Sequence, residues 1–223
     1  MERAAIIVAG GTGTRFGGAV PKQFMLLQGK PILWHALMAF HAADRDMRIV
    51  LVLPEQHLDI WRTMCIGHGI TVEHEVVAGG SERYHSVRAG VFSLSGKPII
   101  AVHDGVRPLV SKDLIERCFA EAAAHGSAIP VVPVTSSFRL VENGNSRAID
   151  RSALRVVQTP QCFQADVLRE AFEQRFDPRF TDEASLVEGT GRQVHLVEGE
   201  ITNIKVTRPM DLRLLEGLMG RTD

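Results

Sequence analysis

The chain has few cysteines, no excess of charge of either sign and no long apolar run, and each absence excludes a class of protein. Its three cysteines are widely spaced, so they predict neither a disulfide framework nor a Cys-x-x-Cys metal site, and we expect packing residues or unreactive thiols. The 25 Lys and Arg against 26 Asp and Glu give a net charge of −1, which argues against binding to nucleic acid or an acidic membrane. No apolar stretch approaches the ~18 to 20 residues that span a bilayer.

Other familiar signatures are missing as well. The nine histidines show no His-x-x-x-His or His-Glu-x-x-His spacing, so the sequence does not predict a catalytic zinc. There is no Gly-x-Ser-x-Gly elbow of a serine hydrolase. The first apolar stretch is too short for a signal peptide, and we therefore expect a cytoplasmic protein. With 45% hydrophobic and 23% charged residues, the composition is typical of a globular protein with a sizeable core.

Short β-branched runs alternate with helical patterns through the first 134 residues, as in βαβ units with a mainly parallel sheet. Strands are expected at residues 4–9, 48–53, 71–77, 98–103 and 128–134. Apolar residues at helical spacing predict helices within residues 32–40, 58–65, 84–94 and 114–122. Ser111 is expected to cap the last of these helices, and Gly126 to follow its end. The predicted fold class is α/β, with a Rossmann-like, doubly wound sheet in a single domain over residues 1–223.

The pattern changes after residue 134. Two short polar strands flank Asn143-Gly144, a strong hairpin signal because both positions tolerate positive φ. We expect a projecting β-arm inserted at about residues 135–155. Beyond it the sequence predicts helices at residues 167–172 and from 181–183, strands near 194–197 and 201–206, and a last helix that begins at Pro209.

A glycine-rich loop, residues 10–23, follows the first predicted strand. In open α/β sheets ligands bind beyond the carboxyl ends of the strands, so phosphates are expected at this loop. Neither the dinucleotide fingerprint nor the Walker pattern fits its glycine spacing. What remains is a long loop with two cations, Arg15 and Lys22, that can wrap a triphosphate and neutralise a leaving pyrophosphate. The alternative is a plain glycine turn with two solvated basic side chains.

Six segments in order resemble the sugar-nucleotidyltransferase-like cytidylyltransferases over essentially the whole chain. The nearest branch is the one whose acceptor is 2-C-methyl-D-erythritol 4-phosphate, in the non-mevalonate isoprenoid pathway. The segments are Ala9-Gly10-Gly11-x-Gly13-x-Arg15 with Pro21-Lys22-Gln23-Phe24, Gly79-Gly80-x-x-Arg83-x-x-Ser86, His103 to Pro108, Thr159-Pro160-Gln161, Thr181 to Ser185 and Asn203 to Thr207. The resemblance implies an enzyme that joins CTP to a small polyol phosphate and releases pyrophosphate.

The resemblance also implies a role for each motif residue. Catalysis would fall to Arg15, Lys22, Asp104 and Lys205, with Mg²⁺ at Asp104, a carboxylate expected to end the fourth strand beside the glycine loop. Nucleotide binding would fall to Ala9, Gly10, Gly11, Gly13, Gly80, Arg83, Ser86 and Gly105. Acceptor binding would fall to Arg107, Ser137, Arg151 and Lys205. The family commonly has threonine at the position of Ser137 and an alanine pair at Gly105-Val106.

Each of these roles has a plainer alternative. Asp104-Gly105 could be a simple turn, and Lys205 a solvated lysine on the polar face of a strand. Arg151 resembles a family arginine that reaches across a dimer, but it could also make an ordinary salt bridge in the arm. We expect a homodimer through the arm, because an isolated hairpin is marginally stable in water. The rival functions are the same transfer to ribitol 5-phosphate and a regulator that binds CTP without turnover.

Overall fold

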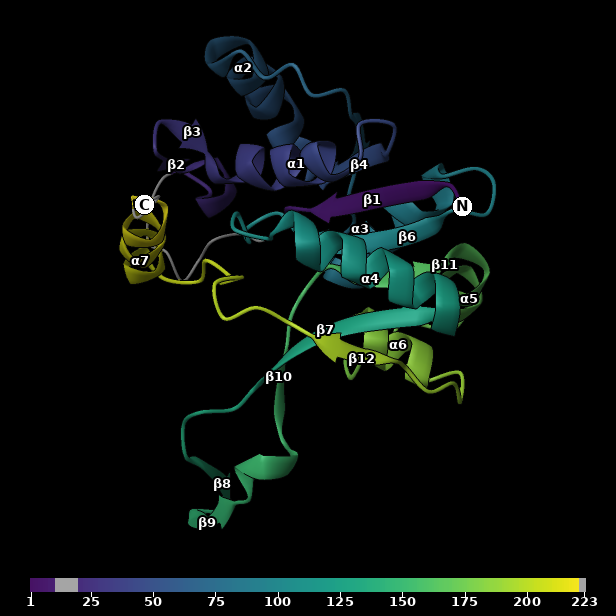
Figure 1. Cartoon of the computed structure of the whole chain (residues 1–223), viewed down its shortest axis with the longest axis vertical. Coiled ribbons are helices and arrows are strands. Elements are labelled where there is room, and N and C mark those ends of the chain that lie inside the picture. Colours follow the sequence, from purple (N-terminus) through teal and green to yellow (C-terminus); the bar gives the residue numbers. More distant parts are fainter. Residues whose placement is uncertain (11–19, 221–223) are drawn as a thin grey trace.

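The computed structural model describes residues 1–10 and 20–220 of the chain (Figure 1). Its strands are β1 (Arg3–Val8), β2 (Leu26–Leu27), β3 (Lys30–Pro31), β4 (Arg48–Leu53), β5 (Glu75–Ala78), β6 (Ile99–Asp104), β7 (Ser127–Pro133), β8 (Phe138–Glu142), β9 (Asn145–Ile149), β10 (Arg155–Val157), β11 (Gln161–Gln164) and β12 (Leu196–Glu198). Its α-helices are α1 (Ile32–Ala43), α2 (Leu58–His68), α3 (Arg83–Ser93), α4 (Lys112–His125), α5 (Ala165–Ala171), α6 (Glu183–Glu188) and α7 (Pro209–Met219). Short 3-10 helices are η2 (Lys22–Phe24), η3 (Glu55–His57) and η4 (Arg151–Ala153).

One mainly parallel sheet forms the centre of the molecule, in the order β10-β7-β11-β6-β1-β4-β5, with β12 paired to β7. β1 lies between β4 and β6 and is parallel to both. β11 runs antiparallel between β6 and β7, so these two strands point the same way. The predicted doubly wound, mainly parallel α/β fold is therefore confirmed.

Helices cover both faces of this sheet (Figure 1). Because successive side chains of a strand point to opposite faces, Ala5 and Ile7 of β1 pack with α1, α2 and α4, whereas Ala4 and Ile6 pack with α3, α5 and α6. All four side chains are fully buried. Burial on both faces explains why β1 has a continuous apolar sequence, as is usual for a parallel strand.

The predicted start and end of α4 are confirmed. Ser111 Oγ accepts a hydrogen bond from the Leu114 backbone N–H at 3.0 Å, and this satisfies one of the free N–H groups of the first turn. Gly126 ends the helix in the left-handed region, with φ of 88°. Among the described residues, no helix combines the length and the apolar character needed to cross a membrane.

The arm is the hairpin of β8 and β9, which extends away from the sheet at the end of the molecule opposite α2 (Figure 1). Asn143 and Gly144 occupy its turn with φ of 50° and 79°, as the hairpin signal predicts. Most of its side chains are exposed, including Phe138 and Val141. The prediction of a projecting arm is confirmed.

Two parts of the sequence interpretation are wrong. No strand forms at residues 201–206, because the backbone there makes local turn contacts instead of a ladder: the Asn203 N–H donates to the Glu200 carbonyl and the Ile204 N–H to the Thr202 carbonyl. Residues 71–74 lie outside β5, which begins at Glu75. The sequence also gave no indication of β11, whose four residues are too few for a visible period.

Candidate active site

A pocket of about 300 Å³ opens where the carboxyl ends of β1 and β6 meet the start of α3. This is the edge at which ligands bind in doubly wound sheets. The pocket brings together predicted site residues from four separate parts of the chain, namely Ala9, Gly10, Lys22, Gly80, Arg83, Ser86, Asp104 and Lys205. Gly11, Gly13 and Arg15 lie outside the described residues, and their roles stay predictions.

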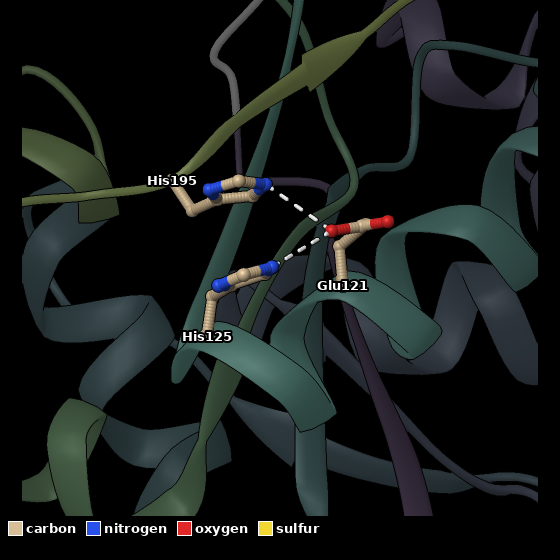
Figure 2. Close-up of side chains that lie close together, drawn as sticks. All are labelled: Glu121, His125 and His195. Atoms are coloured by element: carbon tan, nitrogen blue, oxygen red, sulfur yellow. Dashed lines mark ion pairs between the residues drawn. The ribbon is translucent and has the colours of Figure 1, made fainter.

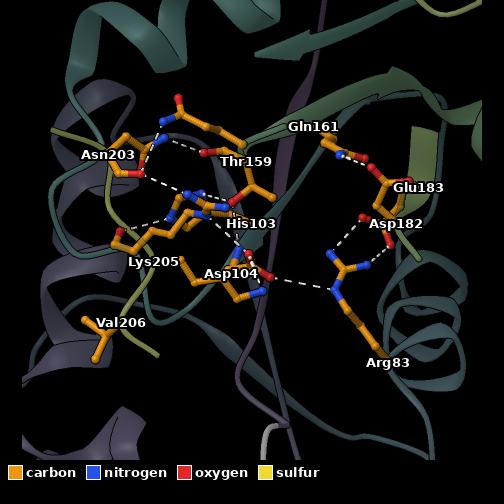
Figure 3. Close-up of polar contacts among 12 residues, drawn as sticks. Arg83, His103, Asp104, Thr159, Gln161, Asp182, Glu183, Asn203, Lys205 and Val206 are labelled. Atoms are coloured by element: carbon orange, nitrogen blue, oxygen red, sulfur yellow. Dashed lines mark hydrogen bonds and ion pairs between the residues drawn. The ribbon is translucent and has the colours of Figure 1, made fainter. Parts of the chain in front are cut away.

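Asp104, the last residue of β6, lies among three cations (Figure 3). Its Oδ2 is 3.0 Å from Lys205 Nζ and 3.2 Å from Arg107 Nε, and its Oδ1 is 3.6 Å from Arg83 Nε. Burial disfavours the charged carboxylate, but attraction to Arg83, Lys205 and Arg107 outweighs it and holds the pKa of Asp104 well below its usual range. The group is therefore an anion at neutral pH.

Arg83 is held by Glu183, a partner that sequence reasoning missed. The two guanidinium nitrogens donate to the two carboxylate oxygens at 2.5 and 2.8 Å, in the fork geometry that Arg and Glu share. Burial acts to lower the pKa of Arg83, but Glu183 and Asp104 raise it above its ordinary value. Glu183 is 2% exposed. The pair thus fixes the guanidinium between β6 and α6 (Figure 3).

The buried Glu183 is itself positioned by the start of α6. Asp182 caps this helix by accepting from the Ser185 backbone N–H at 2.9 Å. Gln161 in β11 donates to Asp182 at 2.8 Å and accepts from the Ala184 N–H at 2.9 Å, so the helix start is tied to the sheet. Two segments of the resemblance, the one from Thr181 to Ser185 and the one that contains Gln161, therefore position Glu183, the partner of Arg83. A pair 100 residues apart in sequence carries no local signal.

A second network holds the segment that bears Lys205. The Asn203 side-chain amide donates to the Thr159 carbonyl at 2.8 Å, and Arg107 donates to the Asn203 carbonyl at 2.8 Å. His103 contacts the Thr159 hydroxyl and the Arg107 carbonyl, each at 3.1 Å. Burial lowers the pKa of His103 to about 4, against smaller contributions from its hydrogen bonds, so the ring is neutral at pH 7.

Lys22 closes the pocket on the side of η2. Its Nζ donates to the Val206 carbonyl at 3.1 Å, which links η2 to the Lys205 segment. The neighbouring Gln23 is buried and donates to the Ala9 carbonyl at 2.9 Å. Lys22 and Lys205, two of the predicted catalytic cations, therefore lie on segments that are held in place by these hydrogen bonds.

The Gly79-Gly80 turn leads into α3 beside Ser86. A Cβ at Gly79 would lie 2.6 Å from Ser86 Oγ, so this position requires the close approach that glycine allows. The Ser86 hydroxyl donates to the Glu82 carbonyl at 3.2 Å, which is a helical contact. Gly105 has a packing reason as well, because a Cβ there would lie 2.7 Å from Leu33 Cδ1 and its N–H donates to the Val8 carbonyl.

The other three residues assigned to the acceptor, Arg107, Ser137 and Arg151, do not line this pocket. Arg107 is buried and borders a second hollow of about 470 Å³, which Lys205, Asn203 and the base of the arm also line. Ser137 and Arg151 are exposed at the two ends of the arm, just outside β8 and β9, and Arg151 donates to the Thr135 carbonyl. The fold of one chain does not bring Ser137 and Arg151 into the pocket at Asp104, and their acceptor-binding role stays a prediction.

The donor set at Asp104 fits Mg²⁺ when phosphates are present. Mg²⁺ prefers hard oxygen ligands and is commonly bound by one or two carboxylates together with substrate phosphates. Asp104 is ionised, and among residues 1–10 and 20–220 the cation contact of its Oδ1 is the longer one, 3.6 Å to Arg83 Nε. The surrounding cations would oppose a metal ion bound alone, so the fit depends on the charge that a nucleotide brings.

Comparisons with known proteins agree over the whole chain. The profile of the 2-C-methyl-D-erythritol 4-phosphate cytidylyltransferase family matches residues 3–221. Curated proteins of that name from Bacteroides fragilis and Porphyromonas gingivalis are each 46% identical, over 98% of this chain and 100% and 98% of their own lengths. The crystal structure of the Thermus thermophilus enzyme of that name superposes with a TM-score of 0.77 at 33% identity, covering 98% of both chains.

Proposed function

Because the chain belongs to the 2-C-methyl-D-erythritol 4-phosphate cytidylyltransferase family, we propose that it transfers the cytidylyl group of CTP to 2-C-methyl-D-erythritol 4-phosphate. The phosphate of the acceptor attacks the α-phosphorus of CTP, a P–O bond forms, and the bond to the leaving pyrophosphate breaks. The observation that carries this proposal is the full-length family match, together with a pocket in which three cations surround one ionised carboxylate.

The chemistry requires no general base. A phosphate monoester has a second pKa of ~6, so the attacking group is already largely dianionic at neutral pH. The pocket accordingly offers charge rather than a nucleophile with an adjacent base. Catalysis then consists of positioning two anions and stabilising the charge that develops on the pyrophosphate.

The positions of the cations suggest which part of the two substrates each one would contact. Lys205 Nζ lies at the carboxyl end of β6, between the pocket and the second hollow, and would hold the acceptor phosphate against the α-phosphate. Lys22 on η2 would contact the triphosphate, with Arg15 of the neighbouring loop. Arg83 is fixed by Glu183 and would contribute a stationary positive charge at the side of α3.

We assign Mg²⁺ to Asp104, with nucleotide phosphates as its other ligands. When bound there, the ion would neutralise phosphate charge that the lysines alone leave uncompensated. Titration of activity with Mg²⁺ after treatment with EDTA tests this assignment. Turnover that survives chelation would overturn it.

We also propose that two chains pair through the arm. Phe138 is 46% exposed and Val141 is 68% exposed, and an isolated hairpin with apolar side chains needs a covering surface. In a two-fold pair the arm of each chain would place Arg151 at the site of the other.

The cytoplasmic location of the protein stays a prediction from the sequence.

Subunit mixing tests the shared site. Arg151→Ala and Lys22→Ala proteins are each expected to be inactive, but a heterodimer would contain one site with both defects and one with neither. Random exchange would then recover up to roughly a quarter of wild-type activity. A pull-down with two tags establishes that exchange has occurred. If exchanged mixtures stay as inactive as the parents, Arg151 does not act across a dimer.

The identity of the acceptor is tested by parallel incubation with CTP and either 2-C-methyl-D-erythritol 4-phosphate or ribitol 5-phosphate, with pyrophosphate release as the readout. The relatives named above are all named for the first acceptor, so we expect release with it and far less with ribitol 5-phosphate. The reverse preference would favour the ribitol enzyme. CTP binding without release for either acceptor would favour a regulator.

A further inference from the structure

A cluster of two histidines and one glutamate lies outside the pocket, and the function above does not use it. Glu121 and His125 are one turn apart at the end of α4, and His195 comes just before β12 (Figure 2). The Nε2 atoms of both rings approach the same oxygen, Glu121 Oε2, at 3.3 Å from His125 and 3.2 Å from His195. We propose that Glu121, His125 and His195 bind a divalent transition-metal ion such as Zn²⁺.

The spacing of the ligand atoms supports the proposal. Two ligands that are each about 2.0 to 2.1 Å from a tetrahedral zinc lie about 3.3 Å apart. The two nitrogen-to-oxygen distances already have this value. The three ligand atoms lie within 4.8 Å of one another, so one metal ion can be reached by all three. The side chains are 38% to 49% exposed, which leaves the rings free to turn and water free to complete the coordination.

The orientation of the rings shows which part of each ligand must move. The two imidazoles are stacked with centroids 4.0 Å apart and planes 16° apart, and both point their Nε2 atoms toward Glu121 (Figure 2). A metal ion binds imidazole in the ring plane, so the rings must tilt toward one another at the Nε2 end. Both side chains are partly solvated, so rotation about their side-chain bonds can supply that tilt.

The backbone beneath the cluster is rigid, as a metal site requires. His195 is fixed by two hydrogen bonds, from its N–H to Ser127 Oγ at 3.0 Å and from the Ile129 N–H to its carbonyl at 2.8 Å. His125 and Glu121 belong to the last turns of α4, where the carbonyl ends of the helix favour a cation. A metal ion would therefore tie the end of α4 to the chain that enters β12.

The chemistry of the donor set selects the metal. Imidazole nitrogen suits zinc, nickel, cobalt and copper, whereas Mg²⁺ prefers oxygen ligands alone. Two nitrogens and one carboxylate oxygen therefore distinguish this cluster from the oxygen site proposed at Asp104. Sequence spacing could not reveal it, because His125 and His195 are 70 residues apart.

The place of the cluster in the fold indicates a structural role. His125 and His195 precede the parallel strands β7 and β12, whereas Asp104 ends β6, which runs in the same direction as β7. The cluster and the pocket are therefore at opposite edges of the sheet. A metal ion here would stabilise the attachment of β12, from which the chain continues toward Lys205.

The test uses full-length protein without a histidine tag, freed of metal by EDTA and dialysed. Zn²⁺ is titrated by calorimetry into the wild type, His125→Ala, His195→Ala, the polar variant His195→Gln and a matched control, His41→Ala, which removes a partly exposed histidine from the last turn of α1. We expect one Zn²⁺ per chain in the wild type and the control, and at least a ten-fold loss of affinity in the three cluster variants. Excess Mg²⁺ should not displace the ion.

Thermal unfolding gives a second readout. At free Zn²⁺ about a hundred-fold above Kd, binding to the folded state alone raises the melting temperature by about 5–10 °C for a chain of this size. This shift should appear in the wild type and His41→Ala, and should be absent in folded His195→Gln. Equal Zn²⁺ affinity in the wild type and His195→Gln would overturn the proposal, as would no binding at millimolar Zn²⁺. The first result would place the ion elsewhere, and the second would leave only hydrogen bonds between the histidines and Glu121.

Discussion

The charge balance around Asp104 predicts how its loss alters nucleotide binding without metal. Arg83, Arg107 and Lys205 provide three positive charges, and Asp104 with Glu183 provides two negative ones, a balance of +1. Asp104→Asn keeps the size of the side chain and raises this balance to +2. The pocket should then attract a metal-free triphosphate more strongly, although the proposed metal ligand is gone.

The size of this effect follows from Coulomb's law. One unit charge about 7 Å from another contributes about 2.4 kcal/mol at an effective dielectric constant of 20. The pocket is open to water, so about 1–2 kcal/mol is the realistic gain, or about 5- to 30-fold tighter binding of CTP in EDTA. Turnover at saturating Mg²⁺ should instead decrease, by ~10²-fold or more.

The substitution also has a cost in stability. Removal of one partner of a fully buried ion pair costs about 3–5 kcal/mol, and the partial exposure of Lys205 and Arg83 reduces this to about 2–3 kcal/mol. Typical domains have 5–15 kcal/mol of stability, so the variant should remain folded.

Three measurements on one preparation test the reasoning. They are calorimetry of CTP binding in EDTA, pyrophosphate release in Mg²⁺ and urea unfolding. The matched control is Asp113→Asn, which removes an exposed carboxylate from the first turn of α4. It should change neither CTP binding in EDTA nor pyrophosphate release in Mg²⁺. Metal-free CTP that binds Asp104→Asn no more tightly than the wild type would refute the charge argument. Full activity in Mg²⁺ would refute the metal assignment.

Three further predictions follow from single contacts. Lys22→Ala should lower kcat by ~10²-fold or more in the pyrophosphate assay, and an unchanged kcat would contradict its proposed role. Glu183→Gln should lower the free energy of unfolding in urea by about 2–3 kcal/mol, and Arg83→Met combined with it should cost less than the two single changes added together. Burial lowers the pKa of His35 below its ordinary 6.5, more than its hydrogen bond to Leu27 raises it. As the pH falls, His35 is therefore protonated in the unfolded chain before it is protonated in the folded chain. The contribution of neutral His35 to the free energy of unfolding is complete above pH 6.5 and decreases as the pH drops below it, and His35→Gln should make this decrease smaller.

The sequence predicted the parts of the site that depend on local order. Asp104 was expected at the end of a strand beside the glycine loop, and it ends β6 in the same pocket as Gly10, because β6 and β1 are parallel and end at one edge. The Arg83–Glu183 pair and the Asn203–Thr159 contact were missed, since each joins segments far apart in the chain and neither has a periodic signature. The acceptor-binding roles of Ser137 and Arg151 stay predictions, and the site proposed for Arg151 belongs to another chain.

The failed strand prediction at residues 201–206 bears directly on catalysis. In a strand, Asn203 and Lys205 would share one face and Val206 would take the other. Here Asn203 is buried, and its carbonyl accepts a hydrogen bond from Arg107. Val206 is also fully buried; its N–H donates to the Val106 carbonyl, and its own carbonyl accepts from Lys22. Lys205 is thus held from both sides while its side chain stays 41% exposed beside Asp104. Charge stabilisation is effective only when the charges are fixed before the reaction. The irregular backbone is fixed by side-chain hydrogen bonds and by separate backbone hydrogen bonds. A regular strand would instead have pointed Asn203 and Lys205 toward the same face.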